Sequence, residues 1–332
     1  MMAANGSLSL ADIYRARRTI APLVTHTPVV PSAVLSRMMG EDVFLKLETV
    51  HPTGAFKLRG AANRILSLTQ AERRCGVVTV STGNHGRAVA YAARYAGVRA
   101  VVCMSALVPE NKVQAIRELG AEVYIVGQSQ DEAEIAARRL VTEEGMVLVH
   151  PFDHPQIIAG QGTIGLELLE DLPELRCVIT GLSGGGLLAG VALALKTASP
   201  QVRIIGVSME QGPAMYASLK AGRPVQVKEA PSLADSLGGG IGLDNRYTFT
   251  LVQRYVDDIV LVSEAQIAEA MVHLFRSERL IAEGGAAVGV AALLHGLVPQ
   301  LSGLIAVIIT GNTVDMEMFT RIVNGEYKSA TR

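Results

Sequence analysis

The sequence contains no tryptophan, and aromatic residues make up only 4% of its 332 residues. Aromatic platforms on which nucleic-acid bases stack are therefore not expected. Lysine and arginine (30) nearly balance aspartate and glutamate (31), giving a net charge of −1. This balance provides no general electrostatic attraction to nucleic acid or to an anionic membrane. The chain also lacks an uninterrupted apolar run of about 18 residues, so no membrane span is predicted.

Cysteine is also scarce. The three cysteines, Cys75, Cys103 and Cys177, are odd in number, far apart and in no C-x-x-C pair. This pattern argues against a disulfide framework and favours a reducing compartment. The N-terminal stretch "MMAANGSLSLADIYRARR" has no apolar core of the kind found in signal peptides. We therefore expect a soluble, cytoplasmic protein.

What the chain does contain is a regular alternation of short Val/Ile-rich runs with amphipathic helical stretches. The strand-like runs are "EDVFLKLE" (41–48), "GVVTVS" (76–81), "RAVVCMS" (99–105), "AEVYIVG" (121–127), "CVITGLS" (177–183), "RIIGVSME" (203–210) and "GLIAVIITG" (303–311). Continuous apolar strands between helices are typical of a mainly parallel sheet covered on both faces. The sequence therefore predicts an α/β fold.

The stretch "CVITGLSGGGLLAGVALALK" (177–196) reads as a strand, a glycine-rich turn and a helix, and it allows three interpretations. Backbone N–H groups of consecutive glycines at a helix start can hold a phosphate. Gly184-x-Gly186-x-x-Ala189, with Glu210 after the next strand, matches the fingerprint of a nicotinamide-dependent oxidoreductase. A serine hydrolase would use Ser183 as its nucleophile, presented on the sharp strand-to-helix turn called the nucleophile elbow. Its partners would be chosen from Asp257, Asp258, His273 and His295.

A lysine at a helix N-terminus is the most unusual feature. In "HPTGAFKLRG" (51–60), the following apolar periodicity predicts that a helix begins near Phe56, so Lys57 and Arg59 lie in its first turn. Cations are unfavourable there because of the helix dipole. The dipole, the neighbouring Arg59 and burial against Phe56 all favour a neutral, reactive Lys57 amine. A lysine and a phosphate-binding loop together indicate pyridoxal 5'-phosphate.

The ordered motifs resemble those of the fold-type II pyridoxal-phosphate enzymes, the tryptophan-synthase-β-like group of threonine dehydratases and serine racemases. The similar stretches are "TGAFKLRGA", "STGNHGRAVA", "HPFDHPQIIAGQGTIGLEL", "SGGGLLAG", "ADSLGGGIGLDN", "ERLIAEGGAAVGVAAL" and "VIITGNTVDM". The resemblance implies two three-layer α/β domains with mainly parallel sheets. Residues 1–77 and 155–332 would form the large cofactor-binding domain and residues 78–154 a small mobile one.

The same resemblance implies roles for individual residues. Lys57 would bond to the cofactor and move protons at the substrate Cα, with Phe56 packed on the cofactor ring. Asn84 would bind the ring hydroxyl, Thr310 would face the pyridine nitrogen, and Glu283 would lie near the ring. The implied phosphate-binding residues are Ser183, Gly184, Gly185, Gly186 and Leu187. The implied loop for the substrate carboxylate consists of Ser81, Thr82, Gly83 and His85.

The resemblance also implies an activity, the elimination of water from a β-hydroxy α-amino acid. "GVSMEQGPAM" and "LADSLGGGIGLDNRYTF" are most similar to dehydratases of hydroxyectoine utilization, which implies a hydroxyectoine-derived substrate. Threonine or serine dehydration and serine racemisation are the alternatives. Thr82 stands where racemases have a serine acid/base, and Ser208 stands where they have a metal-binding glutamate. No metal is therefore predicted, and a homodimer is the family expectation.

Overall fold

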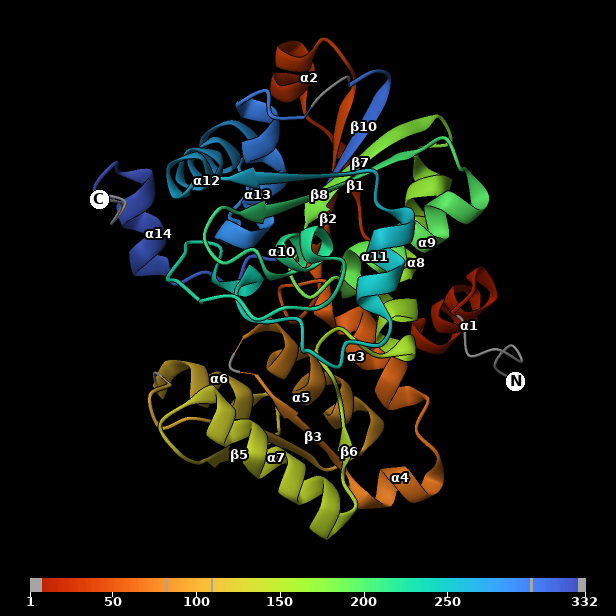
Figure 1. Ribbon diagram of the computed structural model, residues 1–332, viewed down its shortest axis with the longest axis vertical. Coiled ribbons are helices and arrows are strands. Elements are labelled where there is room, and N and C mark those ends of the chain that lie inside the picture. The colour runs from red at the N-terminus through yellow and green to blue at the C-terminus, as the bar shows by residue number, and fades with distance from the viewer. Residues whose placement is uncertain (1–7, 82, 109, 299–300, 328–332) are drawn as a thin grey trace.

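The computed structural model describes residues 8–81, 83–108, 110–298 and 301–327 and contains two sheets, each between layers of helices (Figure 1). The larger sheet consists, in spatial order, of β1 (Val29–Pro31), β2 (Val43–Leu47), β10 (Leu304–Ile309), β7 (Leu175–Gly181), β8 (Arg203–Met209) and β9 (Asp258–Val262). The smaller sheet consists of β5 (Glu122–Ile125), β4 (Ala100–Met104), β3 (Val77–Val80) and β6 (Val147–Leu148). All strand pairs are parallel except β1 with β2.

The helices precede, connect and follow these strands in chain order. They are α1 (Leu10–Ile20), α2 (Ala33–Met39), α3 (Lys57–Leu66), α4 (Gln70–Cys75), α5 (Asn84–Ala96), α6 (Glu110–Glu118), α7 (Gln130–Glu144), α8 (Pro155–Asp171), α9 (Gly186–Ala198), α10 (Ala214–Ala221), α11 (Thr248–Tyr255), α12 (Glu264–Glu278), α13 (Gly284–Leu294) and α14 (Met316–Val323). Short 3₁₀ turns lie at Glu48–Val50 and Asp235–Leu237. In the described part of the chain, no helix is long and apolar enough to cross a membrane.

Helices cover both faces of the larger sheet. Successive side chains along each strand point to opposite faces, so they enter two different cores. Ile179, Ile205 and Val307 pack in the core formed with α12 and α13. Their neighbours Val178 and Ile204 pack in the core formed with α8 and α9. This alternation inside continuous apolar runs confirms the predicted parallel, doubly covered sheet.

The smaller sheet repeats this arrangement with other helices. Val77 and Val102 face the core that includes α3, α5 and α6, whereas Val78 and Val101 face α7. Together the two sheets confirm the predicted fold class of two three-layer α/β units. All four strands of the smaller sheet lie between residues 77 and 148. The division into domains at residues 78 and 154, and the mobility of the smaller one, stay predictions.

Three strands were not predicted from the sequence, namely β1, β6 and β9. β1 has three residues and β6 has two, and both lie at sheet edges. β9 also lies at an edge, and four of its five residues are only half-buried. β1 and β6 are too short to show a pattern in the sequence, whereas β9 does contain a continuous apolar run, "IVLV", which the prediction overlooked.

Candidate active site

Lys57 is the first residue of α3, as predicted, and the segment before it is joined to the end of β10. Ala55 forms an antiparallel bridge with Gly311, and the Phe56 amide donates to the Thr310 carbonyl at 3.0 Å. Gly54 has a φ of +74°, and a Cβ there would lie 2.5 Å from the Asn312 Oδ1. The lysine and Thr310 are thus positioned by the same contact between two loops.

The Lys57 amine is directed into the protein. Its Nζ donates to the Pro151 carbonyl at 2.9 Å and lies 5.3 Å from the centroid of the Phe56 ring. Burial lowers the pKa of Lys57 to about 8, although the negative charge of Glu283 acts in the opposite direction. A substantial fraction of this lysine is therefore neutral near pH 8, which an amine that accepts protons requires.

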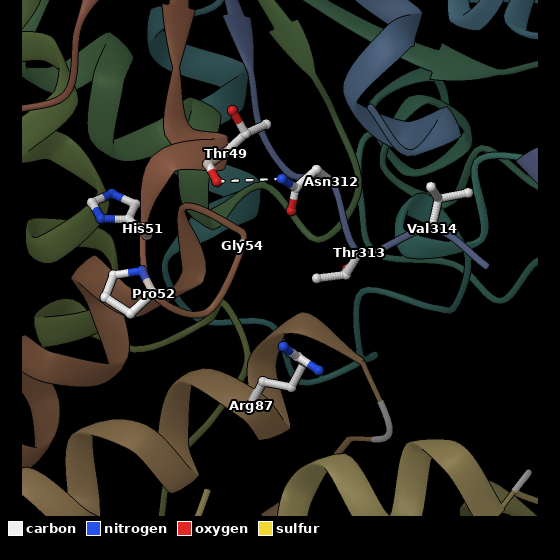
Figure 2. Close-up of a pocket in the computed structure, with 8 residues that line it drawn as sticks. All are labelled: Thr49, His51, Pro52, Gly54, Arg87, Asn312, Thr313 and Val314. Atoms are coloured by element: carbon white, nitrogen blue, oxygen red, sulfur yellow. Dashed lines mark hydrogen bonds between the residues drawn. The ribbon is translucent and has the colours of Figure 1, made fainter. Parts of the chain in front are cut away.

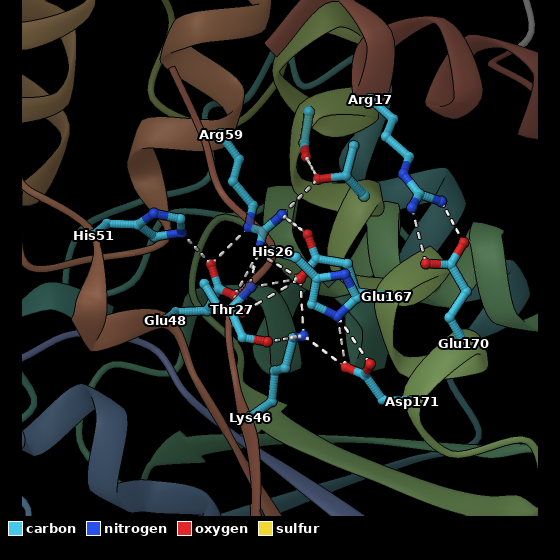
Figure 3. A network of polar contacts seen from close by, with 12 residues as sticks. Arg17, His26, Thr27, Lys46, Glu48, His51, Arg59, Glu167, Glu170 and Asp171 are labelled. Atoms are coloured by element: carbon cyan, nitrogen blue, oxygen red, sulfur yellow. Dashed lines mark hydrogen bonds and ion pairs between the residues drawn. The ribbon is translucent and has the colours of Figure 1, made fainter. Parts of the chain in front are cut away.

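The predicted contribution of Arg59 to this lowered pKa is wrong. Arg59 is completely buried, and carboxylates on two other elements neutralise its charge (Figure 3). Its Nε donates to Glu48 at 2.7 Å and its Nη1 to Glu167 at 2.6 Å. Burial, which tends to lower the pKa of Arg59, is outweighed by these carboxylates, so the guanidinium stays charged. Arg59 therefore ties the first turn of α3 to the end of β2 and to α8.

Asn84 and Glu283, which are 199 positions apart, meet in one polar cluster. The Asn84 Nδ2 donates to the Glu283 Oε1 at 2.9 Å and to its Oε2 at 3.0 Å. The Thr313 hydroxyl contacts the Asn84 Oδ1 and lies 2.8 Å from the Glu283 Oε2. Asn84 begins α5 and Glu283 immediately precedes α13. Sequence reasoning missed Thr313, although it lies inside the recognised stretch "VIITGNTVDM".

The glycine-rich turn 182–185 connects β7 to α9, and neither Gly184 nor the following Gly186 has space for a side chain. A Cβ on Gly184 would lie 2.4 Å from the Phe152 ring, and one on Gly186 would lie 2.9 Å from Phe152 backbone atoms. Gly185 has a φ of +87°, which favours glycine. In the described part of the chain, the amides of these three glycines find no acceptor. Free amides at a helix N-terminus fit a phosphate, so the turn fits pyridoxal phosphate.

Replacing Gly184 by alanine is expected to weaken cofactor binding by at least about tenfold, because the new methyl group collides with Phe152 beside the free amides. The dissociation constant of pyridoxal phosphate, measured by spectroscopic titration of the cofactor-free protein, tests this. Ser183→Ala keeps every backbone amide and should change that constant far less. Equal affinities for Gly184→Ala and the unaltered protein would contradict the assignment of the turn.

The predicted carboxylate loop connects β3 to α5. The Gly83 amide lies 3.4 Å from the Ser81 Oγ, whereas Thr82 lies outside the described residues. The His85 Nε2 donates to the Val149 carbonyl at 2.9 Å. Burial and the nearby Lys57 lower the pKa of His85 to about 3, so its ring is neutral. The His85 side chain is therefore engaged within the protein, and its backbone amide is what the loop can offer to a substrate.

The residues required for a serine hydrolase do not meet at Ser183. Asp257 pairs with Lys196 at 2.8 Å, and His295 pairs with Glu269 at 3.1 Å. The other two candidates, Asp258 and His273, have Arg203 and Glu278 as partners. These contacts place the four residues in other networks and leave the hydrolase interpretation without a base.

The segment 150–154 is a further part of the site, and the sequence analysis assigned it no role. The Asp153 carboxylate accepts hydrogen bonds from the amides of Arg246, Tyr247 and Thr248 at 2.7, 2.9 and 2.8 Å. These contacts hold Pro151 against Lys57 and Phe152 against the glycine turn. Among the described residues, no three His, Cys, Asp or Glu side chains come together as a metal site would require.

Comparisons with known proteins agree with this geometry. Residues 20–311 match the family model described as "Pyridoxal-phosphate dependent enzyme". The chain is 53% identical over 319 residues to a putative threonine dehydratase of Sinorhizobium fredii, covering 96% of each chain. It is 43% identical to an L-threonine ammonia-lyase of Thermotoga maritima, covering 96% of this chain and 78% of the relative. Maize serine racemase superposes with a TM-score of 0.89 at 34% identity, covering 96% of this chain and 99% of the racemase.

Proposed function

This chain belongs to the family of pyridoxal-phosphate-dependent enzymes, and we propose that it is an ammonia-lyase that dehydrates and deaminates L-threonine and L-serine. The observation that carries the proposal is the position of Lys57. Its amine contacts Pro151, and the next residue, Phe152, packs on the glycine turn. The negative charge of Glu283 raises the pKa of the Lys57 amine. A basic amine and a phosphate-binding turn therefore lie on either side of one short segment.

Bound pyridoxal phosphate supplies an electron-withdrawing ring that stabilises negative charge at the substrate Cα. The amides of residues 184–187, assisted by the dipole of α9, would hold the phosphate. Asn84, whose Nδ2 donates to Glu283 in this structure, would bind the ring hydroxyl. Thr310, which directly follows β10 and is 5% exposed, would provide an uncharged hydroxyl for the pyridine nitrogen. A neutral partner there suits elimination, which needs only short-lived charge at Cα.

The substrate is held at the N-terminus of α5, where the loop that begins at Ser81 offers backbone amides to its α-carboxylate. The neutral Lys57 Nζ removes the proton from Cα, and hydroxide leaves from Cβ with the electrons of the Cβ–O bond. Addition of water to the released product and loss of ammonia give a 2-oxo acid. The net products are 2-oxobutanoate and ammonia from threonine, and pyruvate and ammonia from serine.

The choice of these substrates rests on the relatives. The proteins from Sinorhizobium fredii and Thermotoga maritima carry the names of threonine enzymes. Those names support the threonine and serine alternative better than the hydroxyectoine-derived substrate first expected from the sequence, which stays a prediction. The likeness to maize serine racemase makes racemisation a side reaction that the same assay must examine.

A substrate panel tests the proposal. The cofactor-loaded protein is incubated with L-threonine, L-serine, 3-hydroxyaspartate and the β-hydroxy amino acid derived from hydroxyectoine. We expect 2-oxo acid and ammonia in equal amounts from L-threonine and L-serine, with the highest kcat/KM for one of these two. Chiral analysis of the remaining serine measures racemisation. Turnover of the hydroxyectoine-derived compound alone would contradict the proposed substrates, and no turnover of any compound would contradict the activity.

A further inference from the structure

Residues 150–153 form a turn directly before α8, and the side chain of His150 holds this turn together from within. The His150 Nδ1 accepts hydrogen bonds from the Phe152 amide at 3.2 Å and from the Asp153 amide at 2.8 Å. The His150 ring also packs edge-on against the Phe152 ring, with the two centroids 4.6 Å apart. A side-chain acceptor that bonds amides shortly after it in the chain stabilises a turn, as Asp and Asn commonly do. The 150–153 turn therefore depends on an acceptor at the Nδ1 position.

Two residues of the 150–153 turn contact the parts of the site that the reaction requires. The Pro151 carbonyl accepts the hydrogen bond of the Lys57 Nζ at 2.9 Å. The Phe152 ring packs so closely on the glycine turn that a Cβ on Gly184 would lie 2.4 Å from it. A shift of about 1 Å in the 150–153 turn therefore displaces the acceptor of the base and the wall of the phosphate-binding turn together.

The backbone of Lys57 is positioned by contacts that do not involve the 150–153 turn. Figure 2 shows the loop before Lys57 beside the segment after β10, where the Asn312 Nδ2 donates to the Thr49 carbonyl at 3.5 Å. The Lys57 Nζ itself, among the described residues, donates to Pro151 alone. The direction of the amine therefore depends on where the 150–153 turn presents this carbonyl.

We propose that His150 is a positioning residue, whose Nδ1 keeps the Pro151 carbonyl on the Lys57 amine and the Phe152 ring on the glycine turn. The inference rests on the proposed function, because it takes Lys57 as the base. An acceptor at Nδ1 requires a neutral ring that carries its proton on Nε2. Protonation of Nδ1 removes the acceptor and turns an N–H toward two amides, so both hydrogen bonds are lost.

The surroundings of His150 keep its ring neutral. Burial has the largest effect and lowers the pKa of His150, and the positive charge of Lys57 acts in the same direction. Carboxylates nearby oppose this shift only in part. The titratable side chains that face His150 come from its own segment, from α3, α5 and α7, and from the loop before α11, and they are Asp153, His154, Lys57, His85, Glu134 and Asp244. The two bonds are therefore present at neutral pH and are lost as the pH falls through a pKa below the usual 6.5.

Two substitutions separate the acceptor from its titration. Asparagine places its Oδ1 where histidine has Nδ1 and does not titrate, so His150→Asn keeps the turn at every pH, whereas His150→Ala removes the acceptor. His295→Asn is the matched control, since His295 is exposed and pairs with Glu269. The dissociation constant of pyridoxal phosphate is measured by spectroscopic titration of each full-length protein from about pH 8 to about pH 4.

At about pH 8, His150→Ala is expected to bind the cofactor about tenfold or more weakly than the unaltered protein, whereas His150→Asn and His295→Asn bind within about threefold of it. Toward about pH 4, the unaltered protein and His295→Asn should lose about tenfold more affinity than His150→Asn, because every other titrating group near position 150 is common to all three. The kcat for L-threonine should show the same difference in pH dependence.

Equal affinity of His150→Ala and the unaltered protein at about pH 8 would overturn the inference. So would identical pH profiles of cofactor affinity for the unaltered protein and His150→Asn, because a merely structural histidine would leave no acid titration for asparagine to abolish. The cofactor titration needs no turnover, so it decides the role of His150 independently of the proposed reaction.

Discussion

Lys57→Ala is expected to lower kcat for L-threonine and L-serine by about 10³-fold or more, because the variant loses the neutral amine proposed to remove the proton from the substrate Cα. Two features suit this lysine to act as a base. Its Nζ donates a hydrogen bond to the Pro151 carbonyl, and burial lowers its pKa to about 8. The variant should still fold, since the Lys57 side chain is only half-buried. Steady-state kinetics with the cofactor supplied in excess provide the measurement.

The matched control is Lys220→Ala, which removes an exposed lysine near the end of α10, where it stacks on Tyr216. Its kcat should equal that of the unaltered protein. Borohydride treatment followed by peptide mass analysis should place the fixed cofactor on Lys57 alone. A Lys57→Ala protein that keeps more than about a tenth of the normal kcat would contradict the assigned base, as would cofactor fixed at another lysine.

Arg59→Met is expected to cause the largest loss of stability, roughly 3–5 kcal/mol, because the buried Glu48 and Glu167 lose the guanidinium they share, and Lys46 remains beside Glu167 alone. Glu48 is completely buried and Glu167 is 6% exposed, and both accept hydrogen bonds from Arg59. Burial raises the pKa of Glu48, but Arg59 and His51 more than offset this and keep the carboxylate ionised. Methionine fills a similar volume without restoring the charge.

Chemical denaturation followed by circular dichroism measures this loss as a shift of the unfolding midpoint. Arg17→Met is the control, because Arg17 forms an ion pair with Glu170 at the surface of the protein. Surface pairs contribute only about 0–1 kcal/mol, so this variant should unfold almost like the unaltered protein. Similar midpoints for the two variants would show that the buried network in Figure 3 does not stabilise the fold as the structure implies.

The strands that are buried on both faces could be predicted from the sequence. β7, β8 and β10 occupy the interior of the larger sheet, and their Val/Ile runs have helices on both sides. β1 and β6 were missed because they have only three and two residues, and β9 was missed although it contains the apolar run "IVLV". The glycine turn was also readable, since consecutive glycines before an apolar helix have few structural explanations other than close backbone approach.

The causes of the lowered pKa of Lys57 could be predicted from the sequence only in part. The sequence showed two cations in the first turn of a helix and suggested that Arg59 helps to lower the pKa of Lys57. In the fold, Arg59 instead pairs with Glu167, which is 108 positions away, and with Glu48. Long-range ion pairs leave no periodic pattern in a sequence, so neither partner was identifiable in advance.

The sequence by itself determined the fold class and the cofactor, and it predicted the reactive lysine and the phosphate-binding turn, because each depends on local patterns or on motifs in a fixed order. Only the tertiary structure decided that burial, without a contribution from Arg59, lowers the pKa of Lys57 and that Thr313 joins Asn84, 229 positions away. Burial and charge pairing depend on which distant segments meet, and that is settled when the two sheets and their helices pack together.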